Sequence, residues 1–122
     1  MKDFRQLQVW AKAHTATLLI YRLTARFPVQ ERYGLTSQLR RASASIAANI
    51  AGGCGRNSDG DFHRFLATAM GSAVEVEYFL LLARDLGFLD DASYRVAERG
   101  VLEVQRMLGS LIRKVGAERM RG

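Results

Sequence analysis

The chain has 122 residues, a mass of 13.6 kDa and a net charge of +6, with 48% apolar and 25% charged residues. This length fits one folded domain, and this composition excludes intrinsic disorder, collagen-like repeats and low-complexity sequence. The longest run of strongly apolar residues, 79–83, is far shorter than the roughly 20 residues that cross a bilayer, so we expect no membrane partner.

Four segments repeat apolar residues at the three- and four-residue spacing of a helix, and none has the alternation typical of strands. The expected helices cover residues 3–27, 33–52, 59–87 and 91–115. Because the connections are short, consecutive helices turn back on one another. The sequence therefore predicts an all-α fold, an up-down-up-down four-helix bundle that forms a single domain over 1–122.

The first expected helix carries a seam of residues at alternating steps of three and four, which we expect to face the core. Pro28 ends this helix, because proline cannot donate the next backbone hydrogen bond and biases the preceding residue away from helical geometry. The seam consists of Phe4, Leu7, Ala11, His14, Leu18, Tyr21 and Ala25.

The second expected helix is unusually rich in small residues, which let a neighbouring helix approach at the short end of the usual range of about 8–10 Å. We expect Gly52, Gly53 and Gly55 to end it. Its inward residues are Leu35, Leu39, Ala42, Ile46 and Ile50.

The third expected helix is apolar on two opposite sides. Ser58 is its expected N-cap, with Asp61 three residues further on. A small bundle covers one apolar side, so the second side predicts a protein interface, with Met70, Val74 and Leu81 as its candidate residues and ordinary bundle core as the alternative. The inward seam is Phe62, Leu66, Ala69, Ala73, Val76, Leu80 and Ala83.

The fourth expected helix begins near Asp90 or Asp91 and has a strict three-four seam, which is typical of coiled-coil-like packing. We expect the residues from Gly116 onward to fray. The seam is Tyr94, Ala97, Val101, Val104, Leu108, Leu111 and Val115.

The residues that could carry catalysis or bind a metal are few. A di-iron bundle needs Glu-x-x-His steps, and neither His14 nor His63 follows a Glu by three residues, so we expect no metal and no cofactor. The glycine-rich loop 52–61 lacks the Lys of a P-loop and the Glu of a calcium loop. Cys54 beside Arg56, with His63 as base, is the one candidate for thiol chemistry, and an ordinary thiol is favoured. We therefore expect a protein that is not an enzyme.

The basic residues are more informative, because 18 cations against 12 acids favour polyanionic partners. Two helices carry basic stripes that match a phosphate backbone, where counterion release provides affinity without base specificity. The alternative is a solvated face, with Glu98 and Glu103 interspersed and Arg41 free to pair with Glu75 or Glu77. The candidate nucleic-acid-binding residues are Arg5, Lys12, Arg22 and Arg26 on the first helix, Arg40 and Arg41 on the second, and Arg95, Arg99, Arg106 and Arg113 on the fourth.

Several ordered motifs between Phe4 and Val115 give the chain a family resemblance. The motifs are Leu7-x-Val9-Trp10-x-Lys12-Ala13, Phe27-Pro28-x-x-Glu31-x-Tyr33-Gly34-Leu35, Gln38-Leu39-Arg40-Arg41-Ala42, Ser45-Ile46-x-Ala48-Asn49-Ile50-Ala51 and Gly71-Ser72-x-x-Glu75. With them the chain resembles the small bacterial four-helix bundle proteins encoded in intervening sequences of 23S ribosomal RNA genes. One departure is Gly52, where family members usually carry Glu.

The resemblance implies a protomer that assembles into a ring, typically a homopentamer, with no established enzymatic activity. A related branch resembles the accessory protein of diversity-generating retroelements, a basic pentamer that binds nucleic acid and a reverse transcriptase. We therefore expect a non-enzymatic, ring-forming bundle that binds RNA or DNA through phosphates, with a purely structural or protein-interaction module as the alternative. The unpaired Cys54 and a charged N-terminal segment without a secretory signal predict a cytoplasmic location.

Overall fold

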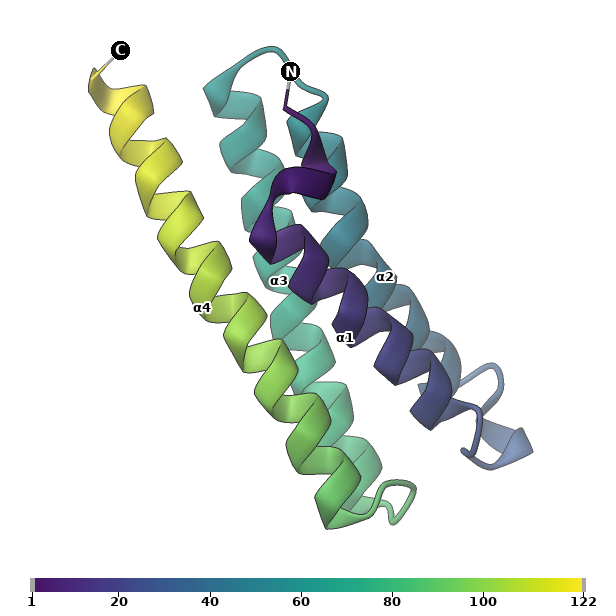
Figure 1. The fold of residues 1–122 in the computed structure, drawn as a ribbon. Helices are drawn as coiled ribbons and strands as arrows, with labels where there is room; N and C mark the ends of the chain where they lie inside the picture. The colour runs from purple at the N-terminus through teal and green to yellow at the C-terminus, as the bar shows by residue number, and fades with distance from the viewer. Residues whose placement is uncertain (1, 122) are drawn as a thin grey trace.

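The computed structural model describes residues 2–121, and these contain helices but no strand. The four long helices are α1 (Gln8–Thr24), α2 (Leu35–Cys54), α3 (Asp59–Asp85) and α4 (Asp91–Arg121), with short 3₁₀ helices at Phe4–Gln6 (η1) and Val29–Glu31 (η2). Consecutive helices run in opposite directions (Figure 1). Each helix packs against its sequence neighbours, and α4 returns to α1. The predicted all-α class is confirmed, and the arrangement is a four-helix bundle.

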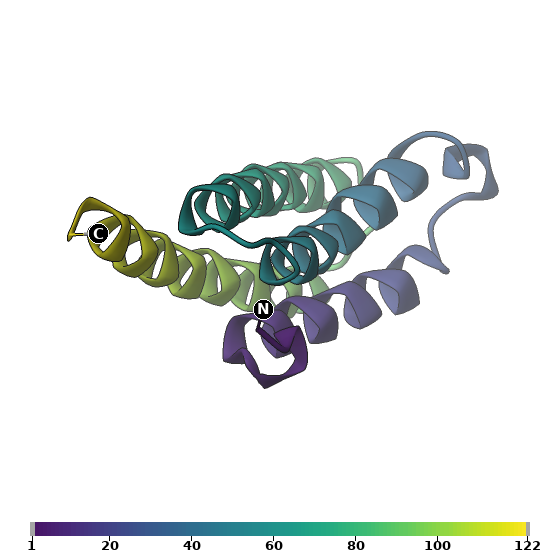
Figure 2. The ribbon, with the colours of Figure 1, turned by 90° about the horizontal axis from the view of Figure 1, so that it is seen from above.

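Helices α1 and α3 lie on the diagonal of the bundle, and within the described residues their backbones do not approach to a Cα–Cα distance of 8 Å. The view from above shows α2 and α4 between them on either side (Figure 2). The outward faces of α1 and α3 therefore point in opposite directions from the core. This arrangement decides where their remaining apolar residues are displayed.

The expected inward seam of the first helix is wrong. The helix is broken at Leu7, whose extended backbone separates η1 from α1, and it ends at Thr24 rather than at 27. The side chains that face the core belong to another set, and the predicted residues Leu18 and Tyr21 are 46% and 43% exposed. The core-facing residues of this segment are Val9, Ala13, Ala16, Ile20, Thr24 and Phe27.

Close packing of α1 against α2 explains which face of α1 is buried. Ala13 and Ala16 are buried, and the Thr17 hydroxyl donates a hydrogen bond to the Ser43 carbonyl of α2 at 3.0 Å. A threonine side chain reaches the backbone of a neighbouring helix only where the two helices are close. The face with small residues fits this seam, so the larger residues of α1 turn outward.

The small residues of α2 also make room for side chains of α3. Helix α2 continues through Gly52 and Gly53 to Cys54, so the expectation that these two glycines end it is wrong, whereas Gly55, the third predicted residue, is its C-cap. A Cβ atom at Gly53 would lie 2.9 Å from side-chain atoms of both Phe62 and Phe65. The glycines therefore make room for two phenylalanines rather than stopping the helix. The predicted inward residues Leu35, Leu39, Ala42, Ile46 and Ile50 are all buried.

The seams of α3 and α4 agree with the prediction. All seven expected residues of α3 are buried, as are those of α4 except Leu111, which is half-buried. The Ser58 hydroxyl caps α3 by accepting from the Asp61 N–H at 3.1 Å. The expected fraying from Gly116 is wrong, because α4 continues to Arg121 with Val115 buried and Gly116 beside the His63 ring of α3.

We predict that Ala13→Leu destabilises the protein by about 1–3 kcal/mol, because an added isobutyl group has no space in the α1–α2 seam. Ala48→Leu, at an exposed alanine of α2, is the matched control and should change stability by less than about 0.5 kcal/mol. Urea unfolding followed by circular dichroism measures both. Equal effects of the two variants would contradict this orientation of α1.

Candidate nucleic-acid interface and interaction surfaces

The outward side of α4 carries a row of four exposed arginines, Arg95, Arg99, Arg106 and Arg113. Their spacings of four and seven residues keep them on one side of the helix. At 1.5 Å per residue the row is about 27 Å long. We refer to these four residues as the arginine row.

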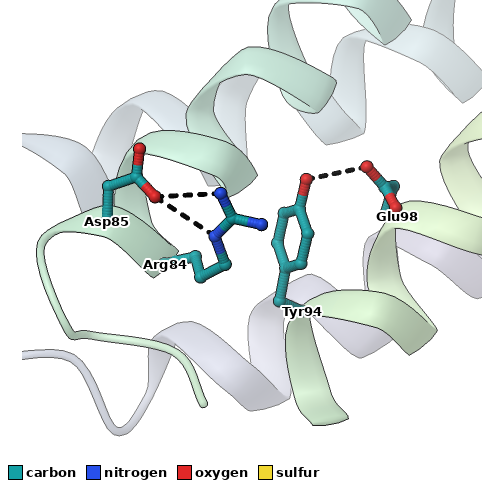
Figure 3. A network of polar contacts seen from close by, with 4 residues as sticks. All are labelled: Arg84, Asp85, Tyr94 and Glu98. Carbon is teal, nitrogen blue, oxygen red and sulfur yellow. Dashed lines mark hydrogen bonds and ion pairs between the residues drawn. The ribbon is translucent and has the colours of Figure 1, made fainter. Parts of the chain in front are cut away.

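The acid expected to neutralise this row, Glu98, is held elsewhere. The buried Tyr94 hydroxyl donates to Glu98 Oε2 at 2.7 Å, and this hydrogen bond is the main reason that the pKa of Tyr94 is raised (Figure 3). Arg84 lies over the Tyr94 ring, 4.6 Å from its centroid, and binds Asp85 through two nitrogens at 3.1 Å. Glu98 is thus half-buried in contact with Tyr94, not interspersed among the arginines.

The second acid, Glu103, lies at the contact between α1 and α4. Its Oε1 is 3.6 Å from Lys12 Nζ and 3.9 Å from Arg106. Two cations from two helices therefore share one carboxylate, which leaves an excess of positive charge on the face that α1 and α4 form together. Arg22 lies about 2.8 helical turns after Lys12 on α1, and Arg26 lies beyond Thr24, where α1 ends.

The other predicted cations do not join this face. Arg5 pairs with Asp3 at 3.5 Å. Arg40 is half-buried and structural: it donates to Thr24 Oγ1 at 2.8 Å and to the Tyr21 carbonyl at 3.2 Å, and so ties α2 to α1. Arg41 is exposed and makes no ion pair with Glu75 or Glu77 in residues 2–121.

The thiol and imidazole groups show no sign of activation. Cys54 is buried, and this burial raises the pKa of its thiol, which opposes thiolate formation. Among the residues described, no hydrogen bond joins it to His63. His14 is exposed and stacks on Trp10, with 5.0 Å between the ring centroids. In this part of the chain no three metal-binding side chains come together.

At position 52, where family members usually carry Glu, this chain has Gly, and the Phe65 ring packs beside it. A Cβ at Gly52 would lie 3.1 Å from the Phe65 ring, so this ring fills the space beside it. Arg56 and Arg64 lie over the same ring, 4.8 Å and 4.9 Å from its centroid. Arg56 therefore interacts with an aromatic ring that packs beside the position where family members usually carry Glu.

The second apolar side of α3 is exposed, with Val74 and Leu81 at 50% and 36%. Met70, the third predicted interface residue, is half-buried beside Gly109 of α4. Sequence reasoning missed Tyr78, which is 55% exposed and lies between Val74 and Leu81 at the same three-four spacing. We refer to Val74, Tyr78 and Leu81 as the α3 stripe.

The exposed stripe gives α3 a composition that a membrane span would also have. An 18-residue window of this helix has a mean hydropathy of 1.5, and 33% of the window is buried in the bundle. One side of α3 packs against α2 and α4, so its apolar content divides between the core and the α3 stripe. The expected absence of a membrane partner stays a prediction.

Helix α1 displays a second exposed stripe, formed by the residues that the sequence placed in the core. Ala11, His14, Leu18 and Tyr21 are exposed along one side of α1, and we refer to them as the α1 stripe. Figure 2 shows α1 and α3 on opposite sides of the bundle, and each helix carries one of the two exposed stripes. Leu18 of the α1 stripe and Val74 and Leu81 of the α3 stripe are exposed apolar side chains.

Comparison with known proteins agrees with this architecture. Residues 5–110 match the model of the 23S rRNA-intervening sequence protein family. A crystal structure from Bacteroides thetaiotaomicron, of a protein of unknown function from the S23 ribosomal protein family, is similar with a TM-score of 0.77 and 26% identity. The match covers 85% of this chain and 97% of the other. A search of curated proteins found no match.

The match over most of the chain shows that the protein belongs to the 23S rRNA-intervening sequence protein family. The resemblance inferred from the sequence motifs is confirmed. The related crystal structure has no assigned function, so the function must be argued from the surfaces described above.

Asp90 caps α4 and fixes the start of the helix that carries the arginine row. The Ser93 N–H donates to Asp90 Oδ1 at 2.7 Å, and this hydrogen bond holds the pKa of the Asp90 carboxyl below its usual value. A carboxyl with a lowered folded-state pKa stabilises the fold above its unfolded pKa of about 4. The stabilisation is lost as the pH falls through the folded-state pKa.

We therefore predict that Asp90→Ala lowers the melting temperature by roughly 2–6 °C at pH 7, and that the difference shrinks as the pH falls below about 4. Asp91→Ala, which removes the neighbouring exposed carboxylate, should have a smaller effect. Thermal unfolding followed by circular dichroism measures both variants. An undiminished difference at the lowest pH would contradict the capping role.

Proposed function

We propose that the protein is a non-enzymatic homo-oligomer that binds RNA or DNA through the face formed by α1 and α4. The observation that carries this proposal is the arginine row. Nearby acids leave it positively charged, because Glu98 accepts a hydrogen bond from Tyr94 and Glu103 lies close to both Lys12 and Arg106. Four guanidinium groups in line are suited to phosphates, which arginine binds through two parallel hydrogen bonds.

The geometry supports binding to a backbone rather than to bases. A row of about 27 Å matches roughly eight steps of a duplex strand at 3.4 Å per step. Phosphate contacts of this kind position a nucleic acid without reading its sequence. We expect affinity that falls steeply with salt concentration and little preference among sequences.

The two apolar stripes support assembly. When one surface of a protomer docks on a different surface of the next, the contact is heterologous, and copies add in the same direction until a ring closes. The α1 and α3 stripes are two such surfaces on opposite sides of the bundle. A ring of five, as the family resemblance implies, would carry five times +6, or +30, which would steer polyanions toward it.

The second candidate function is a protein-interaction module whose charge serves solubility. The two stripes favour it, because apolar surface attracts proteins rather than phosphates. The two functions are compatible in one scaffold, and their experimental signatures differ: nucleic-acid binding depends on the arginine row, whereas assembly depends on the stripes.

We predict that reversing Arg95, Arg99 and Arg106 to Glu together weakens binding of a structured RNA by at least about tenfold at low salt. The slope of log affinity against log salt should flatten by roughly two to three. Fluorescence anisotropy measures both quantities. Arg32, Arg64 and Arg119 are exposed and lie outside the row, so the same reversals there form a charge-matched control. An equal loss in the control would mean that net charge, not this face, binds RNA.

Heterologous assembly predicts a specific mixing result. Ala11→Glu with Leu18→Glu should inactivate the α1 stripe, and Val74→Glu with Leu81→Glu the α3 stripe, so each variant alone should be a monomer of about 13.6 kDa. A mixture of the two variants should form dimers of twice that mass, because each variant retains the surface that the other lacks. These dimers should not grow further, since neither end keeps an intact stripe. Light scattering measures the masses.

Val96→Glu is the control for this experiment, since Val96 is 54% exposed on α4 outside both stripes and should leave the mass unchanged. A mixture that stays monomeric would show that the stripes do not dock on each other.

A further inference from the structure

A groove with a volume of about 460 Å³ lies between the start of α1 and the C-terminal half of α4. It exists because the extended backbone at Leu7 turns the chain away into η1, so α1 begins at Gln8. Helix α4 runs on to Arg121, and its last turns extend past the start of α1 (Figure 1). The groove lies where this part of α4 passes Leu7 and the first turns of α1.

The groove has an apolar floor and a basic rim. Leu7, Met107 and Leu111 are half-buried in the floor. Three exposed cations, Lys12, Arg106 and Lys114, stand along the rim. The only acid that lines the groove is Glu103, which Lys12 already pairs at 3.6 Å. The rim is therefore left with net positive charge around apolar side chains.

We infer that this groove binds an acidic amphipathic helix of a partner protein. Helices that dock in grooves insert apolar residues at i, i+3 or i+4, and i+7. Residues 107–114 of α4 offer about two turns of matching length. Met107 adapts its shape to different apolar side chains, and the rim cations select acidic residues on the flanks of the incoming helix.

The floor argues against nucleic acid as the occupant. It is lined by aliphatic and thioether side chains, which offer phosphates no donor and bases no aromatic ring to stack on. A second copy of this chain is expected at the α1 and α3 stripes, and no residue of either stripe lines the groove. The inference rests on the second candidate function, a protein-interaction module, and it requires neither the ring nor nucleic-acid binding.

The test uses a fluorescent synthetic peptide of about 15 residues, with Leu at three-four spacing and Glu at the flanking positions. A peptide with Lys in place of every Glu is the control ligand. We expect saturable binding of the acidic peptide to the full-length protein and none of the basic one. Absence of saturable binding by the acidic peptide would overturn the inference.

Two charge-matched double variants locate the binding surface. Arg106→Glu with Lys114→Glu alters the rim, whereas Arg95→Glu with Arg99→Glu alters the same helix away from the groove. Peptide affinity should fall roughly tenfold or more in the first variant and less than about twofold in the second. RNA affinity should fall in both variants, because Arg106 belongs to the arginine row as well as to the rim. Peptide affinity should fall in the first variant alone, so failure of this inference is distinguishable from failure of nucleic-acid binding.

Three outcomes would overturn the assignment. Equal loss of peptide binding in both variants would show that the peptide binds through net charge and not in the groove. A changed oligomeric mass in the rim variant would make the groove a contact between copies of the chain, and loss of RNA binding confined to the rim variant would make it a nucleic-acid surface.

A second readout needs no variant. With ¹³C-labelled methionine methyl groups, the acidic peptide should shift the NMR signal of Met107 and leave that of Met120, which is 90% exposed near the end of α4, unchanged. A shift of Met120 without Met107 would contradict binding in the groove.

Discussion

The close approach of α2 to its two neighbours is the constraint on which the rest of the structure depends. Helix α2 presents little side-chain bulk, so Ala13 and Ala16 of α1 fit against it, and Phe62 and Phe65 of α3 occupy the space above Gly52 and Gly53. Tight seams of this kind admit only small residues on one side. The larger apolar residues of α1 and α3 that find no room inside are displayed outside.

This displacement links the packing to the proposed function. Leu18 and Tyr21 on α1, and Val74 and Tyr78 on α3, are exposed on opposite sides of the bundle. A protomer with two different apolar surfaces is suited to head-to-tail assembly. Helix α4 contributes differently, because its seam is buried except for the half-buried Leu111, and its outward side carries the arginine row. The two apolar stripes and the arginine row thus lie on three different helices.

Much of the fold could be predicted from the sequence, because helical periodicity and capping are local properties. Spacing and residue type alone were enough to predict the seams of α2, α3 and α4 and the cap at Ser58. The face of α1 could not be chosen that way, since α1 has two apolar faces and the deciding factor is the bulk of α2, a neighbour in space. The same limit applies to Gly53, whose role depends on phenylalanines from another helix.

The candidate site was likewise predictable only where its features follow from residue spacing. Exposure of the arginine row followed from spacing, and so did the stripe that contains Val74 and Leu81. The structural role of Arg40 and the withdrawal of Glu98 could not be foreseen, because both depend on hydrogen bonds whose geometry only the packed helices define. The groove at Met107 depends on where α1 begins, which the sequence placed several residues too early.

The central claim is that this bundle is the protomer of an assembly that binds nucleic acid. The most direct test is the solution mass by light scattering, with and without a structured RNA, at about 50 and 200 mM salt. The account predicts a particle several times 13.6 kDa that takes up RNA at low salt and releases it at the higher concentration. A monomer of 13.6 kDa whose mass is unchanged by RNA at low salt would contradict it.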